Sequence, residues 1–224
     1  MNPDSELLFR FHNIIPGARL KQTTLDQLHP AITLWLIDPE GWDKPLTQEQ
    51  ASAVTECPPY WSFCWGSGKA LANWVTQNRH KFAGKTILDV GSGSGVVAIA
   101  CAMAGAARVT ACDIDPLSLL AVQQNALLNG VQIELLENLA DYRGRADYLF
   151  AADVLYDPDN LKLVDDFLEL ADSVLLADSR IKQFAAAGYQ LVDAVNAVTV
   201  PDLGENEDVK QVRLYCGRKG SQSA

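Results

Sequence analysis

The stretch KTILDVGSGSGVVAIACAMAGAARVTACDID, residues 85–115, predicts a strand, a glycine turn, a helix and a second strand that ends at an acidic residue. Its first apolar run, residues 86–90, leads into three glycines spaced two apart, and the alanine-rich segment that follows is long enough for a helix. The second strand, residues 108–112, ends at Asp113. In a doubly wound sheet, ligands bind at the carboxyl ends of the parallel strands. We therefore expect the glycine turn and Asp113 to face one ligand.

The spacing of these glycines narrows the choice of ligand. The dinucleotide fingerprint G-x-G-x-x-G/A requires a small residue where this chain has Val96, and the turn lacks the Lys-Ser/Thr pair of a phosphate-binding loop. A turn with no pyrophosphate to hold suits an uncharged or zwitterionic ligand tail. Gly91, Gly93 and Gly95 let the backbone approach that tail closely, and Asp113 can accept the two hydroxyls of a ribose. The alternative is an ordinary tight turn without a ligand; the flanking strands, the helix and Asp113 favour the cofactor.

Composition limits the kind of protein. With 224 residues, 48% of them hydrophobic, the chain is long enough for one domain with a sizeable core. Its net charge of −10 argues against a nucleic-acid backbone as the main partner. The 5 cysteines form no C-x-x-C pair, which predicts a reduced protein without a zinc site. The amino end has no signal pattern, and the longest uncharged apolar run, residues 96–107, is too short to span a bilayer. We expect a soluble, cytoplasmic protein with no membrane partner, and its oligomeric state stays open.

Strands and helices alternate after residue 58, which predicts an α/β, Rossmann-like, doubly wound seven-stranded sheet with a terminal antiparallel hairpin. The expected strands are residues 86–90, 108–112, 131–136, 147–152, 173–177, 189–200 and 209–216. The expected helices are residues 67–78, 96–104, 117–129, 161–170 and a segment ending at Ala187.

The first 58 residues follow no such alternation. We expect a helix over residues 7–15, a strand over 32–37 and a short capped helix at Thr47–Gln50. Because this part is too small for its own core, we interpret residues 1–58 as a lid or substrate-shaping segment and residues 59–219 as the main domain.

An aromatic segment, PPYWSFCWGSG at residues 58–68, joins the two parts. Trp61 and Trp65 are four residues apart, so on a helical turn they would share one face. An indole face suits a sulfonium cation or an adenine ring. The alternative is a hydrophobic plug between lid and core, and for Phe63 that alternative is preferred.

Four stretches in this order resemble the class I, seven-β-strand methyltransferases that use S-adenosylmethionine (SAM): PPYWSFCWGSGKALANWV, LDVGSGSGVVAIA, ACDIDPLSLLAVQQNALLNG and ADVLYD. They are most similar to the electron transfer flavoprotein β-subunit lysine methyltransferases and their bacterial relatives. The stretch RLKQTTLDQLHPAITLWL of this chain also resembles the amino-terminal segment of that group. The resemblance implies the class I methyltransferase fold and SAM as cofactor. Two departures, Pro30-Ala31-Ile32 for Pro-Glu-Ile and Trp65-Gly66-Ser67-Gly68 for a W-x-G-G turn, leave the protein substrate open.

The resemblance also implies the roles of individual residues, with no metal among them. Those that would bind the cofactor are Asp89, Gly91, Gly93 and Gly95 for its methionine part, Asp113 for the ribose, Ile114, Asn138 and Leu139 for the adenine, and Trp61 and Trp65 to close the pocket. Those that would form the wall at the methyl acceptor are Asp153, Tyr156 and Asp157.

Methyl transfer from a sulfonium is an in-line displacement, so positioning accounts for most of the catalysis. A lysine ammonium, with a pKa of about 10.4, must first lose a proton, and a carboxylate with a pKa of about 4 is too weak a base to hold it. We therefore expect Asp153 and Asp157 to bind and orient the amine while the proton leaves to water, and Tyr156 to hydrogen-bond or stack. The alternatives are that Asp157 only caps the helix after Pro158 and that Tyr156 only packs.

The resulting prediction is a SAM-dependent N-methyltransferase that modifies lysine side chains of a partner protein similar to the electron transfer flavoprotein β-subunit. The alternatives are a small-molecule or ribosomal-protein N-methyltransferase, a non-catalytic SAM-binding partner protein, and a nicotinamide-dinucleotide oxidoreductase, which Val96 disfavours. His12, His29 and His80 lie where no general base is expected, and no G-x-S-x-G elbow is present.

Overall fold

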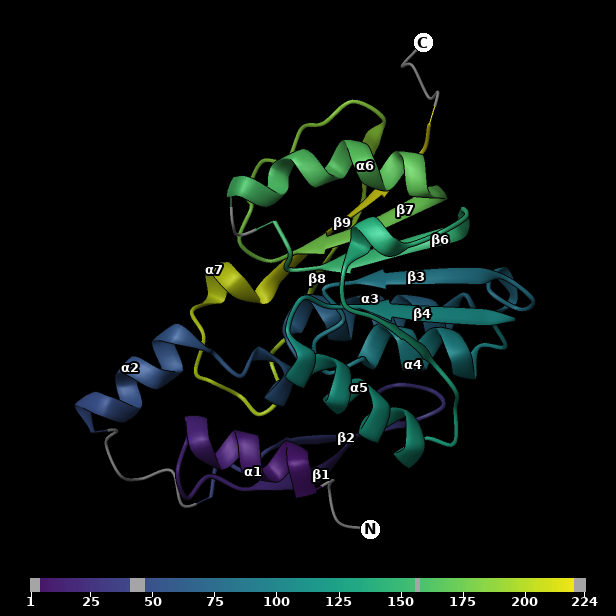
Figure 1. The fold of residues 1–224 in the computed structure, drawn as a ribbon. Helices are drawn as coiled ribbons and strands as arrows, with labels where there is room; N and C mark the ends of the chain where they lie inside the picture. Colours follow the sequence, from purple (N-terminus) through teal and green to yellow (C-terminus); the bar gives the residue numbers. More distant parts are fainter. Residues whose placement is uncertain (1–4, 41–46, 156–157, 220–224) are drawn as a thin grey trace.

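Seven strands form one mixed sheet in the computed structural model, which describes residues 5–40, 47–155 and 158–219 (Figure 1). Their order is β5-β4-β3-β6-β7-β9-β8; the first five are parallel, and β9 pairs antiparallel with both β7 and β8. The strands are β3 (Thr86–Val90), β4 (Arg108–Cys112), β5 (Glu134–Leu136), β6 (Ala146–Ala152), β7 (Ala171–Asp178), β8 (Tyr189–Asn196) and β9 (Gln211–Gly217). The predicted seven-stranded α/β fold with a terminal antiparallel hairpin is confirmed.

The strand order reverses at β3. From this strand the chain proceeds outward to β4 and β5, and then returns to place β6 on the other side of β3. Such a reversal leaves a crevice at the carboxyl ends of the strands, because the two connections leave in opposite directions. The glycine turn that follows β3 therefore lies at the position where doubly wound sheets bind their ligands.

Helices cover the two faces of the sheet unequally. The helices α3 (Gly66–Gln77), α4 (Val96–Met103) and α5 (Pro116–Leu128) pack on one face of the sheet, and α6 (Leu163–Leu170) packs on the other. A four-residue helix, α7 (Glu207–Lys210), precedes β9. The packing of α3 on α4 is close, because a Cβ on Gly68 would lie 3.3 Å from Val96 Cγ1. Four of the five predicted helices of this part are confirmed, with small shifts in their ends.

Two predictions for this part were wrong. Residues 179–188, between β7 and β8, contain no helix, and the strand expected over residues 131–136 pairs only from Glu134. In the first case Asp178 accepts the backbone N–H groups of Arg180 and Ile181 as a helix N-cap would, but no helix follows, because Ile181, Phe184 and Ala186 instead pack against the core on the α6 face. In the second, Gly130 with φ 65° ends α5, and the following residues bridge to the sheet edge.

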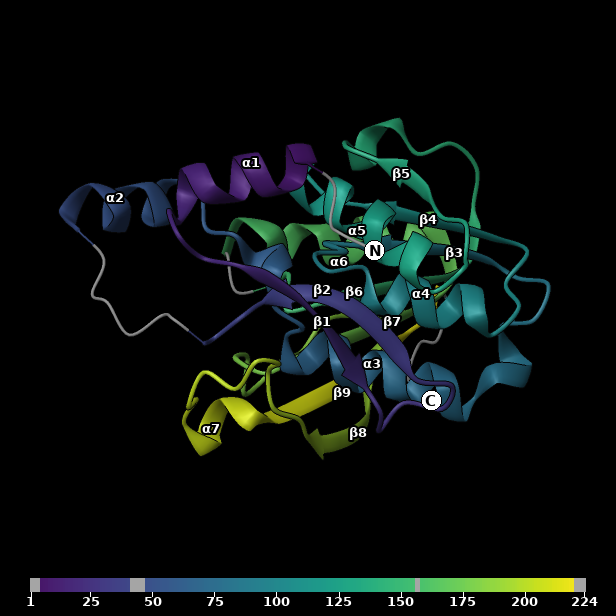
Figure 2. The same ribbon diagram turned by 90° about the horizontal axis from the view of Figure 1, so that it is seen from below.

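The amino-terminal part packs below the helices (Figures 1 and 2). It contains α1 (Ser5–Ile14), the antiparallel hairpin of β1 (Leu20–Leu25) and β2 (Ile32–Ile37), and α2 (Gln48–Glu56) with a Thr47–Gln50 capping box. The expected helix, strand and capped helix are confirmed, whereas the largely polar β1 was not predicted. Five of the six residues of β2 are buried, and Ile32, Leu34 and Leu36 join the main hydrophobic core with α4. A boundary at residue 58 stays a prediction.

In the described part of the chain, no helix combines the length and the hydropathy that crossing a membrane requires.

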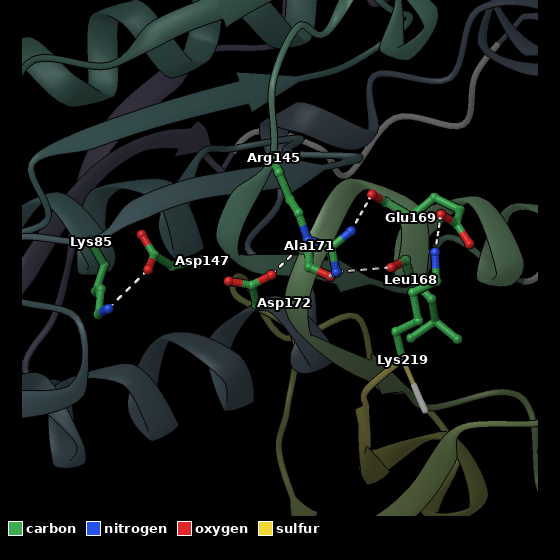
Figure 3. A network of polar contacts seen from close by, with 8 residues as sticks. All are labelled: Lys85, Arg145, Asp147, Leu168, Glu169, Ala171, Asp172 and Lys219. Carbon is green, nitrogen blue, oxygen red and sulfur yellow. Dashed lines mark hydrogen bonds and ion pairs between the residues drawn. The ribbon is translucent and has the colours of Figure 1, made fainter. Parts of the chain in front are cut away.

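Arg145, the residue before β6, lies at the carboxyl end of α6 (Figure 3). Its guanidinium donates to the carbonyls of Leu168, Glu169 and Ala171, with the shortest two contacts at 2.5 and 2.6 Å, and to Asp172 Oδ1 at 2.6 Å. A helix leaves its last carbonyls without partners, and a cation there also interacts favourably with the helix dipole. Arg145 therefore supplies the cap that this helix lacks in its own sequence.

We expect Arg145→Ala to lower the free energy of unfolding by about 2 kcal/mol, because several helix-end carbonyls lose a charged donor. Asp172→Ala is the matched control: it removes only an exposed ion pair and is expected to cost less than about 0.5 kcal/mol. Urea unfolding followed by circular dichroism measures both. Equal losses in the two variants would show that the ion pair, and not the cap, carries the effect.

Candidate cofactor and methyl-acceptor site

The glycine turn after β3 depends on its three glycines. Gly91, Gly93 and Gly95 have φ values of 68°, 50° and 79°, in the left-handed region where a side chain is strained. A Cβ on Gly91 would clash with the side chain of Val154, and one on Gly95 would lie 3.1 Å from Val122. The turn is therefore held tightly between β6 and α5, and its glycines serve this geometry.

Asp113, at the end of β4, is bound to the turn. Its Oδ2 accepts the N–H of Gly93 at 2.8 Å, and its Oδ1 accepts the N–H of Asp115 at 3.0 Å. Burial raises the pKa of this carboxyl, while the two backbone N–H groups act in the opposite direction. Each carboxylate oxygen has a further lone pair, so a bound ribose can still donate to it. The structure thus brings together the turn and the acidic residue that were predicted to share one ligand.

Asp89 and Ser92 are the buried polar residues on either side of Gly91. Asp89 is 1% exposed and accepts the N–H of Ala98 in α4 at 3.1 Å, so it stabilises the first turn of that helix. The hydroxyl of Ser92 is buried, and no group in the described residues hydrogen-bonds to it. A buried hydroxyl without a partner is costly, and a polar ligand group at the turn would satisfy it. The turn therefore fits the cofactor that the resemblance implies.

Burial raises the pKa of Asp89 from 3.8 to about 8. Between those values the folded state binds one proton more than the unfolded chain, so the free energy of unfolding falls as the pH rises, by up to about 1.4 kcal/mol per pH unit. We expect Asp89→Asn, which cannot ionise, to make the decline between pH 5 and pH 8 in the ligand-free protein shallower, because Asp113 and Asp153, whose pKa values are also raised, keep their own contributions. Urea unfolding at the two pH values measures it.

Asp147→Asn is the control for that prediction. Hydrogen bonds from the Thr86 N–H and the Lys85 ammonium lower the pKa of Asp147. The stabilising contribution of Asp147 is therefore lost only when the pH falls below the pKa of an ordinary carboxyl. This variant should keep the decline between pH 5 and pH 8. An unchanged decline in Asp89→Asn would contradict the raised pKa.

The residues predicted to flank an adenine lie next to Asp113 and after β5. Ile114 is 87% exposed, an unusual position for a large apolar side chain directly after a buried strand. Asn138 accepts the N–H of Ala140 at 3.0 Å and thereby caps a short 3₁₀ turn, Leu139–Asp141. Leu139 is half-buried against the core on the α6 face. Contact of these three residues with a cofactor stays a prediction.

The two tryptophans do not share a helical face, contrary to expectation. A 3₁₀ turn covers only Tyr60–Ser62, and Phe63 is extended, so no continuous helical turn joins Trp61 to Trp65, although both pack on the amino-terminal hydrophobic cluster. Trp61 is fully buried against Phe11, with ring centroids 5.3 Å apart, while Trp65 Nε1 donates to the Tyr60 carbonyl at 2.9 Å. Trp61 thus packs inside the amino-terminal core. Closure of a cofactor pocket by the two rings stays a prediction.

Asp153, directly after β6, has a strained backbone, with φ 49°. Its Oδ1 accepts three hydrogen bonds: from Ser67 Oγ at 2.8 Å, and from the N–H and Oγ of Ser179 at 3.1 and 2.9 Å. Within the described residues no group hydrogen-bonds to its Oδ2. Burial raises the pKa of this carboxyl, although the three donors act against the rise. A strained, oriented carboxylate with one oxygen unused can bind an amine.

Tyr156 and Asp157, the other two residues predicted for the acceptor wall, lie outside the described residues. Ser67 and Ser179, which orient Asp153, were not predicted, since neither serine belongs to a recognisable pattern. Near Ser179, the Asp178 carboxylate accepts the backbone N–H of Arg180 at 2.8 Å. No group of three or more His, Cys, Asp or Glu side chains suited to a metal ion occurs in the described ranges.

Comparison with known proteins finds matches over the middle of the chain. Residues 70–171 match the family model described as ribosomal protein L11 methyltransferase (PrmA). The chain is 38% identical over 109 residues to the mouse electron transfer flavoprotein beta subunit lysine methyltransferase, covering 49% of this chain and 42% of that protein. It is 34% identical over 118 residues to a ribosomal protein L11 methyltransferase of Burkholderia thailandensis, covering 51% of this chain and 37% of that one.

The match with these curated relatives spans less than half of their length. Among solved structures, a magnesium protoporphyrin IX methyltransferase from Synechocystis PCC 6803 with bound SAM covers 96% of this chain and 98% of that chain, with a TM-score of 0.53 and 18% identity. At this identity the likeness concerns the fold alone.

Proposed function

We propose that this chain is a class I SAM-dependent methyltransferase that transfers a methyl group from SAM to an amino group of a partner protein; the match of residues 70–171 to the PrmA family model and the seven-stranded fold support the proposal. The observation that carries the proposal is the joining of the glycine turn to Asp113 through the 2.8 Å bond from Gly93, at the point where the strand order reverses. Asp153 lies at the same edge of the sheet as the glycine turn, because the next residue, Val154, contacts Gly91.

The cofactor supplies an electrophilic methyl group on a sulfonium. The protein binds and orients both reactants. Asp113 would accept hydrogen bonds from the ribose hydroxyls, the glycine turn would hold the methionine part, and Ser92 Oγ would donate to a polar group of that part. At the acceptor, Asp153 Oδ2 would accept a hydrogen bond from an N–H of the incoming amine. This bond would align the lone pair of the amine nitrogen with the methyl carbon. The proton of a lysine ammonium leaves to water before transfer.

Lysine is the proposed acceptor residue, and a protein related to the electron transfer flavoprotein β-subunit is the proposed substrate. The support is the 38% identity to the mouse enzyme, which exceeds the 34% identity to the Burkholderia protein over a similar length. A ribosomal protein is the second candidate, favoured by the PrmA match. The net charge of −10 disfavours RNA. A cytoplasmic location belongs to the same proposal.

The test of cofactor and acceptor has two arms. The first is a thermal-shift titration with S-adenosylhomocysteine beside NAD; at about 100 times its dissociation constant a ligand adds roughly 2.7 kcal/mol, which raises Tm by about 5 °C in a chain of this size. A rise with NAD alone would overturn the proposal. The second arm offers radiolabelled SAM together with purified electron transfer flavoprotein or ribosomal protein L11. If neither protein is labelled, the same reaction is run with a cell lysate, and label on small molecules there would favour a small-molecule acceptor. Binding of S-adenosylhomocysteine without any methyl transfer would favour a non-catalytic partner protein.

A further inference from the structure

Asn125 is a fully buried polar side chain in α5 that joins two distant parts of the molecule. Its Oδ1 accepts the N–H of Trp35, in β2, at 2.7 Å. Its Nδ2 donates to the carbonyl of Ser94, in the glycine turn, at 2.9 Å. One amide therefore satisfies a backbone group of the amino-terminal hairpin and a backbone group of the proposed cofactor turn at the same time.

The contact with β2 takes the place of a neighbouring strand. In an antiparallel hairpin, alternate N–H and C=O groups of each strand point away from the partner strand. On β2 these outward groups meet α5, where Asn129 accepts the N–H of Thr33 at 2.9 Å and donates to the carbonyl of Thr33 at 2.7 Å. Asn125 serves Trp35 in the same way. The two asparagines thus hold the hairpin, but of the two only Asn125 also bonds to the glycine turn.

The glycine turn is tied to α5 at a second point. Gly95 packs against Val122, which precedes Asn125 by three residues and so lies on the same face of α5. Together, Val122 and Asn125 fix where the turn lies relative to the helix. A shift of the hairpin that draws Asn125 with it must therefore either break the bond to Ser94 or move the turn.

We propose that Asn125 is a positioning residue that couples docking of the β1–β2 hairpin to the conformation of the cofactor turn. The inference rests on the proposed function, because it concerns affinity for SAM. The coupling is reciprocal: a docked hairpin favours cofactor binding, and a bound cofactor favours the docked hairpin by the same factor. Asn125 acts through Ser94 and Trp35 and need not contact the substrate.

The first test compares Asn125→Ala with Asn129→Ala by calorimetric titration with S-adenosylhomocysteine. Asn129→Ala removes two bonds to the hairpin and none to the turn, so it is the matched control. We expect Asn125→Ala to weaken binding by about 10-fold and Asn129→Ala by less than about 3-fold. Equal weakening would overturn the inference, because the effect would then come from looser hairpin packing in general. So would unchanged binding in Asn125→Ala.

The second test uses the unaltered protein and stands even where Asn125→Ala does not fold. Hydrogen exchange is measured on peptides covering residues 32–37, with and without saturating S-adenosylhomocysteine. We expect the Trp35 amide to exchange about 10-fold more slowly with the ligand, the same factor as in the titration. Binding without slower exchange overturns the coupling alone. Failure of the unaltered protein to bind S-adenosylhomocysteine overturns the proposed function, and the inference with it.

Discussion

Asp153→Asn is expected to lower kcat by about 100-fold, or roughly 2.7 kcal/mol of transition-state stabilisation, with the dissociation constant for S-adenosylhomocysteine within about 3-fold of its original value. The reason is that the carboxylate, held at Oδ1 by Ser67 and Ser179, offers Oδ2 to the acceptor amine. The negative charge of the Asp153 carboxylate strengthens a hydrogen bond from the buried amine, whereas the neutral amide of asparagine does not.

Asparagine is the right replacement at this position because the backbone of Asp153 has φ 49°. Asparagine adopts this region more readily than other residues with a side chain, so the change removes charge and leaves the backbone conformation in place. Single-turnover methyl transfer to the protein acceptor measures the rate. Ser179→Ala is the companion variant; it removes one of the three donors and should reduce the rate by about 10-fold or less. Unchanged turnover in Asp153→Asn would show that the residue is structural.

Asp113→Ala is expected to weaken S-adenosylhomocysteine binding by about 100-fold or more. Two sets of contacts disappear together: the bonds to the N–H groups of Gly93 and Asp115, which organise the turn, and the proposed bonds to the ribose. Hydrogen bonds to a charged group contribute about 1.5–3 kcal/mol each, so the loss of two suffices for this factor.

The control for Asp113→Ala is Asp115→Ala, two residues further along. Asp115 caps α5 by accepting the N–H of Leu117 at 2.9 Å, and its carboxylate does not bond to the turn. This variant should lose about 1 kcal/mol of stability and keep its affinity for S-adenosylhomocysteine within about 3-fold. Calorimetric titration measures both affinities. Comparable binding by the Asp113→Ala protein and the unaltered protein would remove Asp113 from the cofactor site.

The sequence predicted the parts of the site that lie within one βαβ unit. The turn at Gly91, Gly93 and Gly95 and the bond partner Asp113 are close in sequence, and local patterns specify their positions. Ser67 and Ser179, by contrast, reach Asp153 from segments 86 and 26 residues away, so only the packed fold brings them together.

The same difference between local patterns and contacts made by distant segments explains the errors in the predicted secondary structure. The segment 179–188 has helix-forming residues, but Ile181, Phe184 and Ala186 pack against the core on the α6 face, and tertiary contacts outweigh propensity. The polar strand β1 gave no alternating apolar signal, because it lies on the outside of the hairpin and β2 provides the buried apolar surface. The buried position of Trp61 against Phe11 likewise depends on a helix fifty residues earlier in the chain.

The burial of β2 between β1 and the helices has a consequence for biosynthesis. The segment ITLWLI leaves the ribosome long before α5, whose last residue, Leu128, follows Ile37 by about 90 residues. At roughly 5–20 residues per second, translation leaves this apolar strand without its final partners for several seconds. During that interval its apolar side chains are exposed, which makes the segment a binding site for a chaperone.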